Sequence, residues 1–225
     1  MPTPRLILFD LDGTLIDSAP DLAGATNEML AHRGLPALPL AVLRSHVGSG
    51  ARGMLGAAFG CKPGDAEFEA LKSEWFERYE PRLLRETVLF EGITSMLDAL
   101  DAQDLSIGIV TNKAERYAHP VCEALGLTAR ASASAIVGGD STPHRKPHPA
   151  PVLEAARRAN VLPAECVFVG DDERDVLAGR AAGMLTVAVS WGYVDAGKHF
   201  SEWGADHLID TPAQLSQLLQ TLAKN

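Results

Sequence analysis

The chain has 225 residues, of which 46% are hydrophobic and 22% charged, so it can bury a substantial core as one large domain or as a domain with an insertion. Its formal net charge of -9 repels phosphate backbones and argues against nucleic acid as a main partner. Its three cysteines form no CxxC pair, and no stretch is apolar enough for a signal peptide or a membrane span. We therefore expect a cytoplasmic protein that needs neither a disulfide framework, nor zinc, nor a membrane.

Apolar runs bounded by turn residues predict strands, and helical patterns lie between most of them. The predicted strands are Leu6–Asp10, Ser106–Thr111, Ser134–Val137, Val167–Gly170, Thr186–Val189 and His207–Ile209. The predicted helices are Ile93–Ala102, Ala114–Leu125, Ala150–Ala159, Glu173–Ala182 and Pro212–Leu222. This alternation predicts an α/β fold, a Rossmann-like parallel sheet with helices on both faces, whose ligand site lies at the carboxyl ends of the strands.

The stretch after the first strand has a different character, because helical patterns follow one another there without a strand pattern. The helices predicted in it are Asp21–His32, Ala41–Val47, Ala51–Phe59 and Ala66–Arg82. Ser18, Ala19 and Pro20 can begin the first of them. We predict an all-helical insertion of residues 17–85 in a core made of residues 1–16 and 86–225.

Two aspartates one residue apart, Asp10 and Asp12, end the first predicted strand, and Gly13 then turns the chain. Side chains alternate along a strand, so both carboxylates should project together while Leu11 enters the core. Paired carboxylates suit a hard cation and a nucleophile. Two other interpretations are a helix-loop-helix calcium loop, which this spacing matches poorly, and a structural turn with surface acids.

Two later segments carry groups that can hold phosphate. The strand ending at Thr111 supplies a hydroxyl and backbone N–H groups at a helix start, although Thr111 can equally act as the N-cap of that helix. Lys146 lies beside Pro147 in a segment stiffened by two prolines, which limits the freedom of a cation reaching a phosphoryl group. A lysine that is simply solvated is the plainer alternative. His148, between two prolines, fits a rigid turn better than a base or ligand.

A second acidic strand end follows Gly170, where Asp171, Asp172 and Asp175 fall within five residues. Such carboxylates repel one another unless a cation or a basic side chain lies among them. A divalent metal site is therefore expected at this edge of the sheet. Asp172 can instead cap the next helix, and Asp175 can pair with a core cation such as Lys146.

Taken together, the ordered set DxDGT, strand-end Thr, Lys and GDxxxD resembles the signature of the haloacid dehalogenase superfamily over nearly the whole chain. The helical insertion is similar to the cap found after the first motif in one branch of this superfamily. The resemblance implies a phosphotransferase fold and Mg²⁺ as cofactor. Members often have Ser or Thr after the GD pair, where this chain has Asp172.

The resemblance also implies roles for the acids. Asp10 would be the nucleophile that becomes an aspartyl-phosphate, and Asp12 would be the general acid and then the general base. The metal would be bound by the Asp10 carboxylate, the backbone carbonyl of Asp12 and Asp171. Asp172 or Asp175 would approach the metal directly or through water, and which of the two does so stays open.

The phosphoryl oxygens would be held by Thr111, the Asn112 N–H and Lys146, according to the same resemblance. Lys146 would also reduce the repulsion between the phosphate and Asp10. Arg52, in the insertion, would be a selectivity residue, because a guanidinium can hold a substrate carboxylate. The bland alternative for Arg52 is solvation of a helix face.

Finer similarity concerns the substrate. The run from Asp10 to Leu22, the segment VGSGAR that contains Arg52, and Trp191-Gly192-Tyr193 resemble the bacterial phosphoglycolate phosphatase group. The GDDERD run and the segment Trp203–Asp206 also resemble relatives that dephosphorylate N-acetylmuramic acid 6-phosphate. We expect a magnesium-dependent hydrolase of a small phosphorylated metabolite, acting as a monomer or homodimer, with 2-phosphoglycolate as first candidate and that muramic acid ester or another sugar phosphate as the alternative.

Other functions on related scaffolds fit the residues less well. A dehalogenase would not need the second acid at Asp12. A sugar phosphomutase would keep both aspartates, and His32 and His46 in the insertion invite that interpretation, but release of free phosphate would argue against it. A non-catalytic phosphate-responsive domain should lack the long insertion or have lost Asp10 or Asp12.

Overall fold

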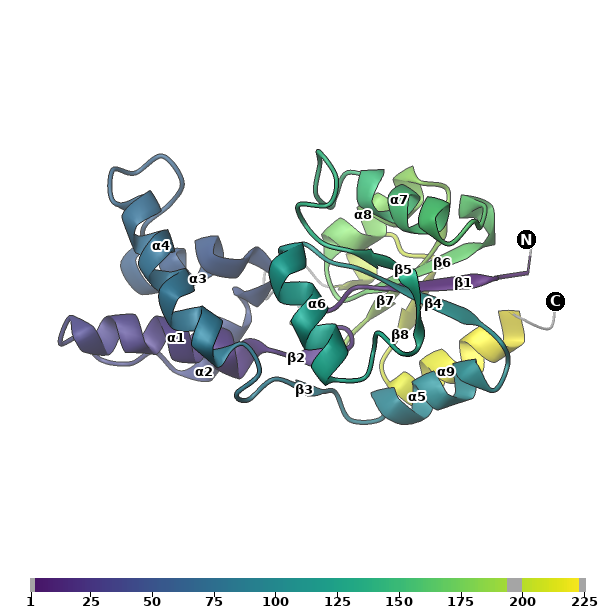
Figure 1. The fold of residues 1–225 in the computed structure, drawn as a ribbon, viewed down its shortest axis with the longest axis horizontal. Helices are drawn as coiled ribbons and strands as arrows, with labels where there is room; N and C mark the ends of the chain where they lie inside the picture. Colours follow the sequence, from purple (N-terminus) through teal and green to yellow (C-terminus); the bar gives the residue numbers. More distant parts are fainter. Residues whose placement is uncertain (1–2, 194–199, 223–225) are drawn as a thin grey trace. The chain divides into compact units, whose positions relative to one another are not determined.

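The computed structural model describes residues 3–193 and 200–222, and a parallel six-stranded sheet forms its centre (Figure 1). The strands follow the order β5-β4-β1-β6-β7-β8. Their bounds are Leu6–Phe9 (β1), Ser106–Val110 (β4), Ala131–Val137 (β5), Cys166–Gly170 (β6), Leu185–Val189 (β7) and His207–Ile209 (β8). The predicted α/β fold with a parallel sheet is confirmed, and the strand ends differ from the prediction by up to three residues.

Strand β1 lies in the middle of the sheet because its side chains are apolar on both faces. All four of its residues are fully buried, as expected for a parallel strand covered on both sides. It pairs with β4 and β6 in parallel register, so that Leu8 lies opposite Gly108 and Phe168. A Cβ at Gly108 would come within 2.7 Å of the Leu8 side chain, and the glycine therefore makes room for the apolar packing of β1.

Helices cover both faces of the sheet. In Figure 1, α7 (Ala150–Arg158) and α8 (Glu173–Ala181) lie on one side of it, and α5 (Ile93–Asp101) and α9 (Pro212–Leu222) on the other. The remaining helix, α6 (Glu115–Ala124), follows β4. On the face of the sheet covered by α7 and α8, Val152 and Ala178 pack in one apolar cluster with Leu8 and Phe168. With both faces covered by helices, a ligand site is expected at the carboxyl ends of the strands.

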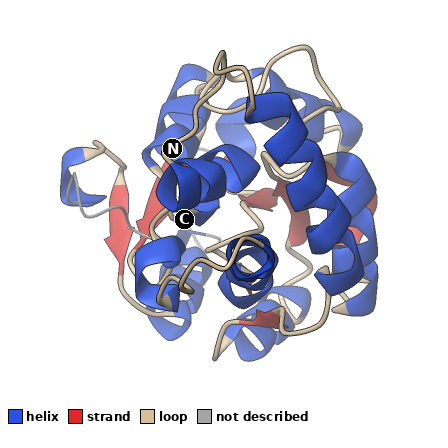
Figure 2. Cartoon of the chain, turned by 90° about the vertical axis from the view of Figure 1, so that its left-hand side faces the viewer, coloured by secondary structure: helices blue, strands red, loops and turns tan. Residues whose placement is uncertain are grey.

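The chain divides into two compact units, the first formed by Met1–Ile16 with Leu89–Asn225, and the second by Asp17–Val88. The second unit is built from helices, coloured blue in Figure 2. They are α1 (Ala19–His32), α2 (Leu40–Arg44), α3 (Gly50–Phe59) and α4 (Phe68–Tyr79), with 3-10 turns at Val47–Ser49 and Glu80–Arg82. Trp75 anchors their core, fully buried, with its indole N–H donating to the Thr26 hydroxyl at 2.9 Å.

Several details of residues 16–89 differ from the sequence prediction. Helix α2 ends at Arg44 instead of Val47, and a separate 3-10 turn follows it. Helix α4 ends at Tyr79, because Pro81 has no N–H with which to continue the helical hydrogen bonds. Two strands were missed, β2 (Ile16–Asp17) and β3 (Val88–Leu89), which pair with each other and are too short to show a pattern of alternation.

Within residues 3–193 and 200–222, every helix is too short or too polar to cross a membrane.

Candidate active site

The acidic strand ends predicted from the sequence lie on neighbouring strands. Asp10 follows β1, Thr111 follows β4 and Asp171 follows β6, and these three strands are adjacent in the sheet. The prediction that Asp10 is itself a strand residue was wrong by one position, although its N–H still donates to the Val169 carbonyl at 2.9 Å. Leu11 is fully buried, as predicted.

Lys146 joins two of these acids. Its Nζ lies 2.8 Å from Oδ1 of Asp10 and 2.7 Å from Oδ1 of Asp175, and donates to the Val110 carbonyl at 2.8 Å. The lysine side chain is only 2% exposed, so the solvated alternative is excluded and the predicted pairing of Asp175 with Lys146 is confirmed. Although burial opposes it, the two carboxylates raise the pKa of Lys146, which remains a cation.

One lysine does not neutralise the acids around it. Burial raises the pKa of Asp10, against the opposing charge of Lys146, and raises that of Asp175 well above its usual range. Oδ1 of Asp10 also accepts the Leu11 N–H at 2.7 Å. The Asp10 side chain is 12% exposed, so a ligand can still reach it.

Asp171 is held on both oxygens without a cationic partner in the described part of the chain. Oδ1 accepts the Thr14 hydroxyl at 2.9 Å, and Oδ2 accepts the Tyr193 N–H at 2.7 Å. A Cβ at Gly13 or Gly192 would lie within 2.4 Å of Oδ2, so both glycines are required for this close approach. Burial, followed by the charge of Asp10, raises the pKa of Asp171 to about 7.

The chemistry of this acid group fits a hard divalent cation. Oxygen atoms of Asp10, Asp171 and Asp175 lie within 4.8 Å of one another, and oxygen ligands at such spacing suit Mg²⁺ or Ca²⁺. Burial and the neighbouring carboxylates raise the pKa of Asp171 and of Asp175, and a bound cation would favour the ionised forms. The structure thus brings together two of the residues predicted as metal ligands, Asp10 and Asp171, with Asp175 as third member.

Asp172 points its carboxylate to a different partner. Its Oδ1 accepts the Arg174 backbone N–H at 2.9 Å, and the Arg174 guanidinium binds both oxygens at 2.6 Å. Burial acts to raise the pKa of Asp172, but the pairing with Arg174 outweighs it and the pKa is lowered. The alternative that Asp172 caps the following helix is confirmed. Of the two candidates for approaching the metal, Asp175 is the one that faces the acid cluster.

The carboxylate of Asp12 meets a lysine that the sequence reasoning missed. Nζ of Lys113 lies 2.8 Å from Oδ1 and 3.1 Å from Oδ2 of Asp12. Lys113 comes two residues after Thr111, at the end of the strand next to β1. Its place in the run Thr-Asn-Lys after a buried strand indicates that it lies near the site, but does not indicate which acid it contacts.

The loop that carries Thr111 is tied to the loop that carries Lys146. Asn112 donates from Nδ2 to the Lys146 carbonyl at 3.1 Å and accepts the Lys146 N–H at 3.0 Å. Thr111 is buried, and its hydroxyl accepts the Lys113 N–H at 3.1 Å. The alternative that Thr111 caps the following helix was wrong, because α6 begins at Glu115 with Ala114 as its N-cap residue. His148 is exposed and its Nδ1 accepts the Ala150 N–H at 3.1 Å, as in a turn.

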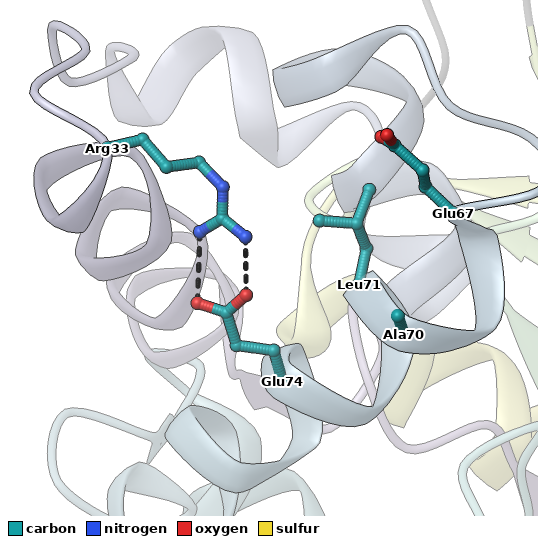
Figure 3. A pocket seen from close by; sticks show the side chains of 5 residues that line it. All are labelled: Arg33, Glu67, Ala70, Leu71 and Glu74. Carbon is teal, nitrogen blue, oxygen red and sulfur yellow. Dashed lines mark hydrogen bonds and ion pairs between the residues drawn. The ribbon is translucent and has the colours of Figure 1, made fainter.

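Arg52 belongs to the other compact unit, where it is exposed near the start of α3. That unit has an open pocket of about 360 Å³, lined by Arg33, Glu67, Ala70, Leu71 and Glu74 (Figure 3). The guanidinium of Arg33 is occupied there by the Glu74 carboxylate, as the dashed lines in Figure 3 mark. None of the predicted site residues lines this pocket.

The fold and the acidic strand ends define a class of protein, and sequence comparison identifies it. A family model for haloacid dehalogenase-like hydrolases matches residues 7–189. The chain belongs to this family of hydrolases, and the resemblance inferred from the motifs is confirmed.

Individual relatives cover almost the full length. The chain is 47% identical over 215 residues to a phosphoglycolate phosphatase of Xanthomonas campestris pv. campestris, with 96% of each chain covered. It is 40% identical over 217 residues to an N-acetylmuramic acid 6-phosphate phosphatase of Pseudomonas putida, again with 96% of each covered. Among solved structures, a predicted phosphoglycolate phosphatase from Haemophilus somnus matches with a TM-score of 0.84 at 30% identity, covering 97% of this chain and 99% of that one.

Proposed function

We propose that the protein is a magnesium-dependent phosphomonoester hydrolase that works through an aspartyl-phosphate on Asp10. The observation that carries the proposal is the position of the Asp10 carboxylate, buried at a strand end, 2.8 Å from Lys146 and beside Asp171. Burying a carboxylate costs free energy of desolvation, and carboxylates in such positions are often functional groups. The similarity to two kinds of phosphatase points in the same direction.

Asp10 and Asp12 divide the reaction between them in this proposal. Oδ1 of Asp10 is fixed by Leu11 and Lys146, and the carboxylate attacks phosphorus as the ester bond breaks. Asp12 gives a proton to the departing alcohol oxygen and then takes one from the water that attacks the aspartyl-phosphate. The enzyme returns to its starting state with the alcohol and phosphate released.

The remaining residues of the site offset the negative charge of the phosphate and of the carboxylates. A carboxylate and a phosphate dianion repel each other, so Lys146 has to offset that repulsion before attack. Thr111 and the Asn112 N–H would hold phosphoryl oxygens that face them. Mg²⁺, bound by the carboxylates of Asp10 and Asp171 and the Asp12 carbonyl, would supply further positive charge at the phosphate. Asp175 would support this group through Lys146.

The helical residues 17–85 would act as the cap of a core made of residues 1–16 and 86–225. A cap excludes water from the reacting phosphate and supplies selectivity. Arg52 is our candidate for selectivity, because it is exposed and its guanidinium suits a substrate carboxylate. If so, Arg52→Met should raise KM for a carboxylate-bearing phosphate ester and leave KM for an ester without a carboxylate unchanged.

The substrate we favour is 2-phosphoglycolate, on the 47% identity to a phosphatase of that name. N-acetylmuramic acid 6-phosphate is the alternative, favoured by the 40% identity to the second kind of relative. Both carry a carboxylate and differ greatly in size. We expect a cytoplasmic monomer or homodimer.

The test is a phosphate-release screen of 2-phosphoglycolate, N-acetylmuramic acid 6-phosphate and several sugar phosphates, with Mg²⁺ present and absent. The favoured substrate should have the highest kcat/KM, and activity should require the metal. A sugar phosphomutase would convert sugar phosphates without accumulating free phosphate. A protein that binds phosphate esters but releases phosphate from none of them would disprove the enzymatic proposal.

A further inference from the structure

The ion pair of Lys113 with Asp12 is a strong contact at the sheet edge that has no place in the reaction as proposed so far. Both N···O distances, 2.8 and 3.1 Å, are within hydrogen-bond range, so the ammonium faces both oxygens of the carboxylate. The two side chains are only 8% and 15% exposed. A contact this dry fixes the direction of the Asp12 side chain more firmly than an exposed pair would.

The backbone of Lys113 is held as well as its side chain. Its N–H donates to the Thr111 hydroxyl at 3.1 Å, and its carbonyl accepts the Gly139 N–H at 2.8 Å. A Cβ at Gly139 would lie 2.2 Å from the Asn112 carbonyl oxygen, so only glycine allows this loop to approach. The lysine therefore extends from a fixed point on one strand end to the acid on the next.

We propose that Lys113 is the positioning residue for Asp12, which holds the acid in the direction needed for proton transfer. The inference rests on the proposed function, because it concerns the general acid and base of that reaction. A carboxyl group can rotate about two side-chain bonds, and only some of these rotamers present an oxygen to the departing alcohol. Lys113 can donate N–H to a carboxyl oxygen whether Asp12 is ionised or protonated, so one contact serves both steps of the reaction.

Leaving groups of different basicity provide the test. The substitution is Lys113→Met, which keeps the length of the side chain and removes its charge. The substrates are p-nitrophenyl, phenyl and ethyl phosphate, whose departing oxygen becomes steadily more basic and so depends increasingly on a proton from Asp12. We expect kcat/KM to fall by less than about 3-fold for the first ester and by about 10- to 100-fold for ethyl phosphate.

A double substitution sharpens this test. In an Asp12→Asn background, Lys113→Met should lower kcat/KM for ethyl phosphate by less than about 2-fold further, because there is no acid left to position. Lys113→Arg, which keeps a donor of similar reach, should recover part of the loss. The matched control is Lys72→Met, which removes a lysine paired with Glu69 at 2.9 Å in the other compact unit and should change no rate.

The outcomes separate this inference from the function on which it rests. If the unmodified protein releases phosphate from none of the esters, the proposed function itself has failed. If it is active and Lys113→Met lowers kcat/KM equally for all three esters, with a lower Tm, the pair only stabilises the loops and the inference is overturned. With 2-phosphoglycolate assayed beside the three esters, a loss confined to 2-phosphoglycolate would also overturn the inference, since Lys113 would then bind the substrate carboxylate.

Discussion

At the edge of the sheet three carboxylates lie close together and only two of them contact a lysine, whereas in the helical unit the carboxylate of Glu74 contacts two arginines. Oxygens of Asp10, Asp171 and Asp175 lie within 4.8 Å of one another, with Lys146 bound to two of these acids. Glu74 accepts from Arg33 at 2.9 Å and from Arg78 at 3.0 Å. The pKa of Asp171 is raised to about 7, mainly by burial, and that of Glu74 is lowered to about 2, mainly by Arg33.

The two regions differ in how the charge of their carboxylates is balanced. The Glu74 carboxylate of the helical unit is matched by Arg33 and Arg78 within the fold, so it adds to stability without any ligand. The acids of the sheet edge are left short of positive charge, which costs stability in the free protein and favours a cation or a phosphate-bound state. Removing a carboxylate charge should therefore relieve repulsion at the sheet edge and remove a favourable ion pair in the helical unit, with opposite effects on stability.

The largest effect is expected at the nucleophile. Asp10→Asn should lower phosphate release by about 10⁴-fold or more, because an amide cannot form the aspartyl-phosphate. The fold should survive with a free energy of unfolding within about 1 kcal/mol of the original, since one of several repelling charges is removed. Steady-state rates with saturating Mg²⁺ and a urea titration measure the two quantities. Near-normal turnover would show that Asp10 is not the nucleophile.

Removal of the shared lysine should cost stability as well as activity. Lys146→Met leaves Asp10 and Asp175 buried without their cation, and breaking a buried pair in this way costs about 3–5 kcal/mol. The control is Lys72→Met, since that lysine is 41% exposed and its pair contributes little. Equal urea midpoints for the two variants would contradict the view that Lys146 holds the acid cluster together.

Much of this site could be predicted from the sequence, because parallel strands fix which residues meet. Asp10 and Asp171 each follow a buried apolar run, and the carboxyl ends of such strands lie at the same edge of the sheet. Lys146 was predicted as a core cation because of its neighbouring prolines and its place in the motif order. The inference for the two acids needed only strand ends and their order, whereas the site role of Lys146 depended on the resemblance to the superfamily signature.

Choices between neighbouring side chains could not be predicted. Asp172 had two possible partners, a metal or the helix that follows, and in the structure it accepts the Arg174 N–H as a helix cap while the Arg174 guanidinium binds both its oxygens. Lys113 contacts Asp12 across two strand ends that are 101 residues apart in sequence, and no local pattern fixes the direction of a flexible lysine. The two-residue strand Ile16–Asp17 is likewise too short for any periodicity.

The pH dependence of stability should show the effect of the buried acids at the sheet edge, Asp171 in particular. Asp171 has a pKa of about 7 in the fold against an ordinary value of 3.8, so between these values the folded protein holds a proton that the unfolded chain has released. Stability of the metal-free protein should then fall as pH rises from about 5 to about 7, by at most about 3 kcal/mol. Asp171→Asn should flatten this fall when urea midpoints are compared in the presence of a chelator.

Added Mg²⁺ gives the complementary measurement. A cation bound by the ionised acids should raise the midpoint more at pH 7 than at pH 5, because protonated carboxyls bind metal poorly. A midpoint that responds equally at both values, or not at all, would contradict the assignment of these acids to a metal.

The smallest effect is expected from Glu74. Its contribution to stability is lost as pH falls, whereas the stability linked to Asp171 is lost as pH rises. Its pKa falls from 4.5 in the unfolded chain to about 2 in the fold, so its contribution is present above pH 4.5 and is lost as pH falls toward 2. Glu74 and Arg33 are 25% and 32% exposed, and solvent screening limits the loss to about 1 kcal/mol or less. Glu74→Gln and Arg33→Met should each flatten the Tm curve between pH 5 and 3 while leaving the fall between pH 5 and 7 unchanged. If either substitution flattened the fall in stability between pH 5 and 7 as Asp171→Asn does, the two groups of acids would not be independent. The proposed difference between the two units would then be wrong.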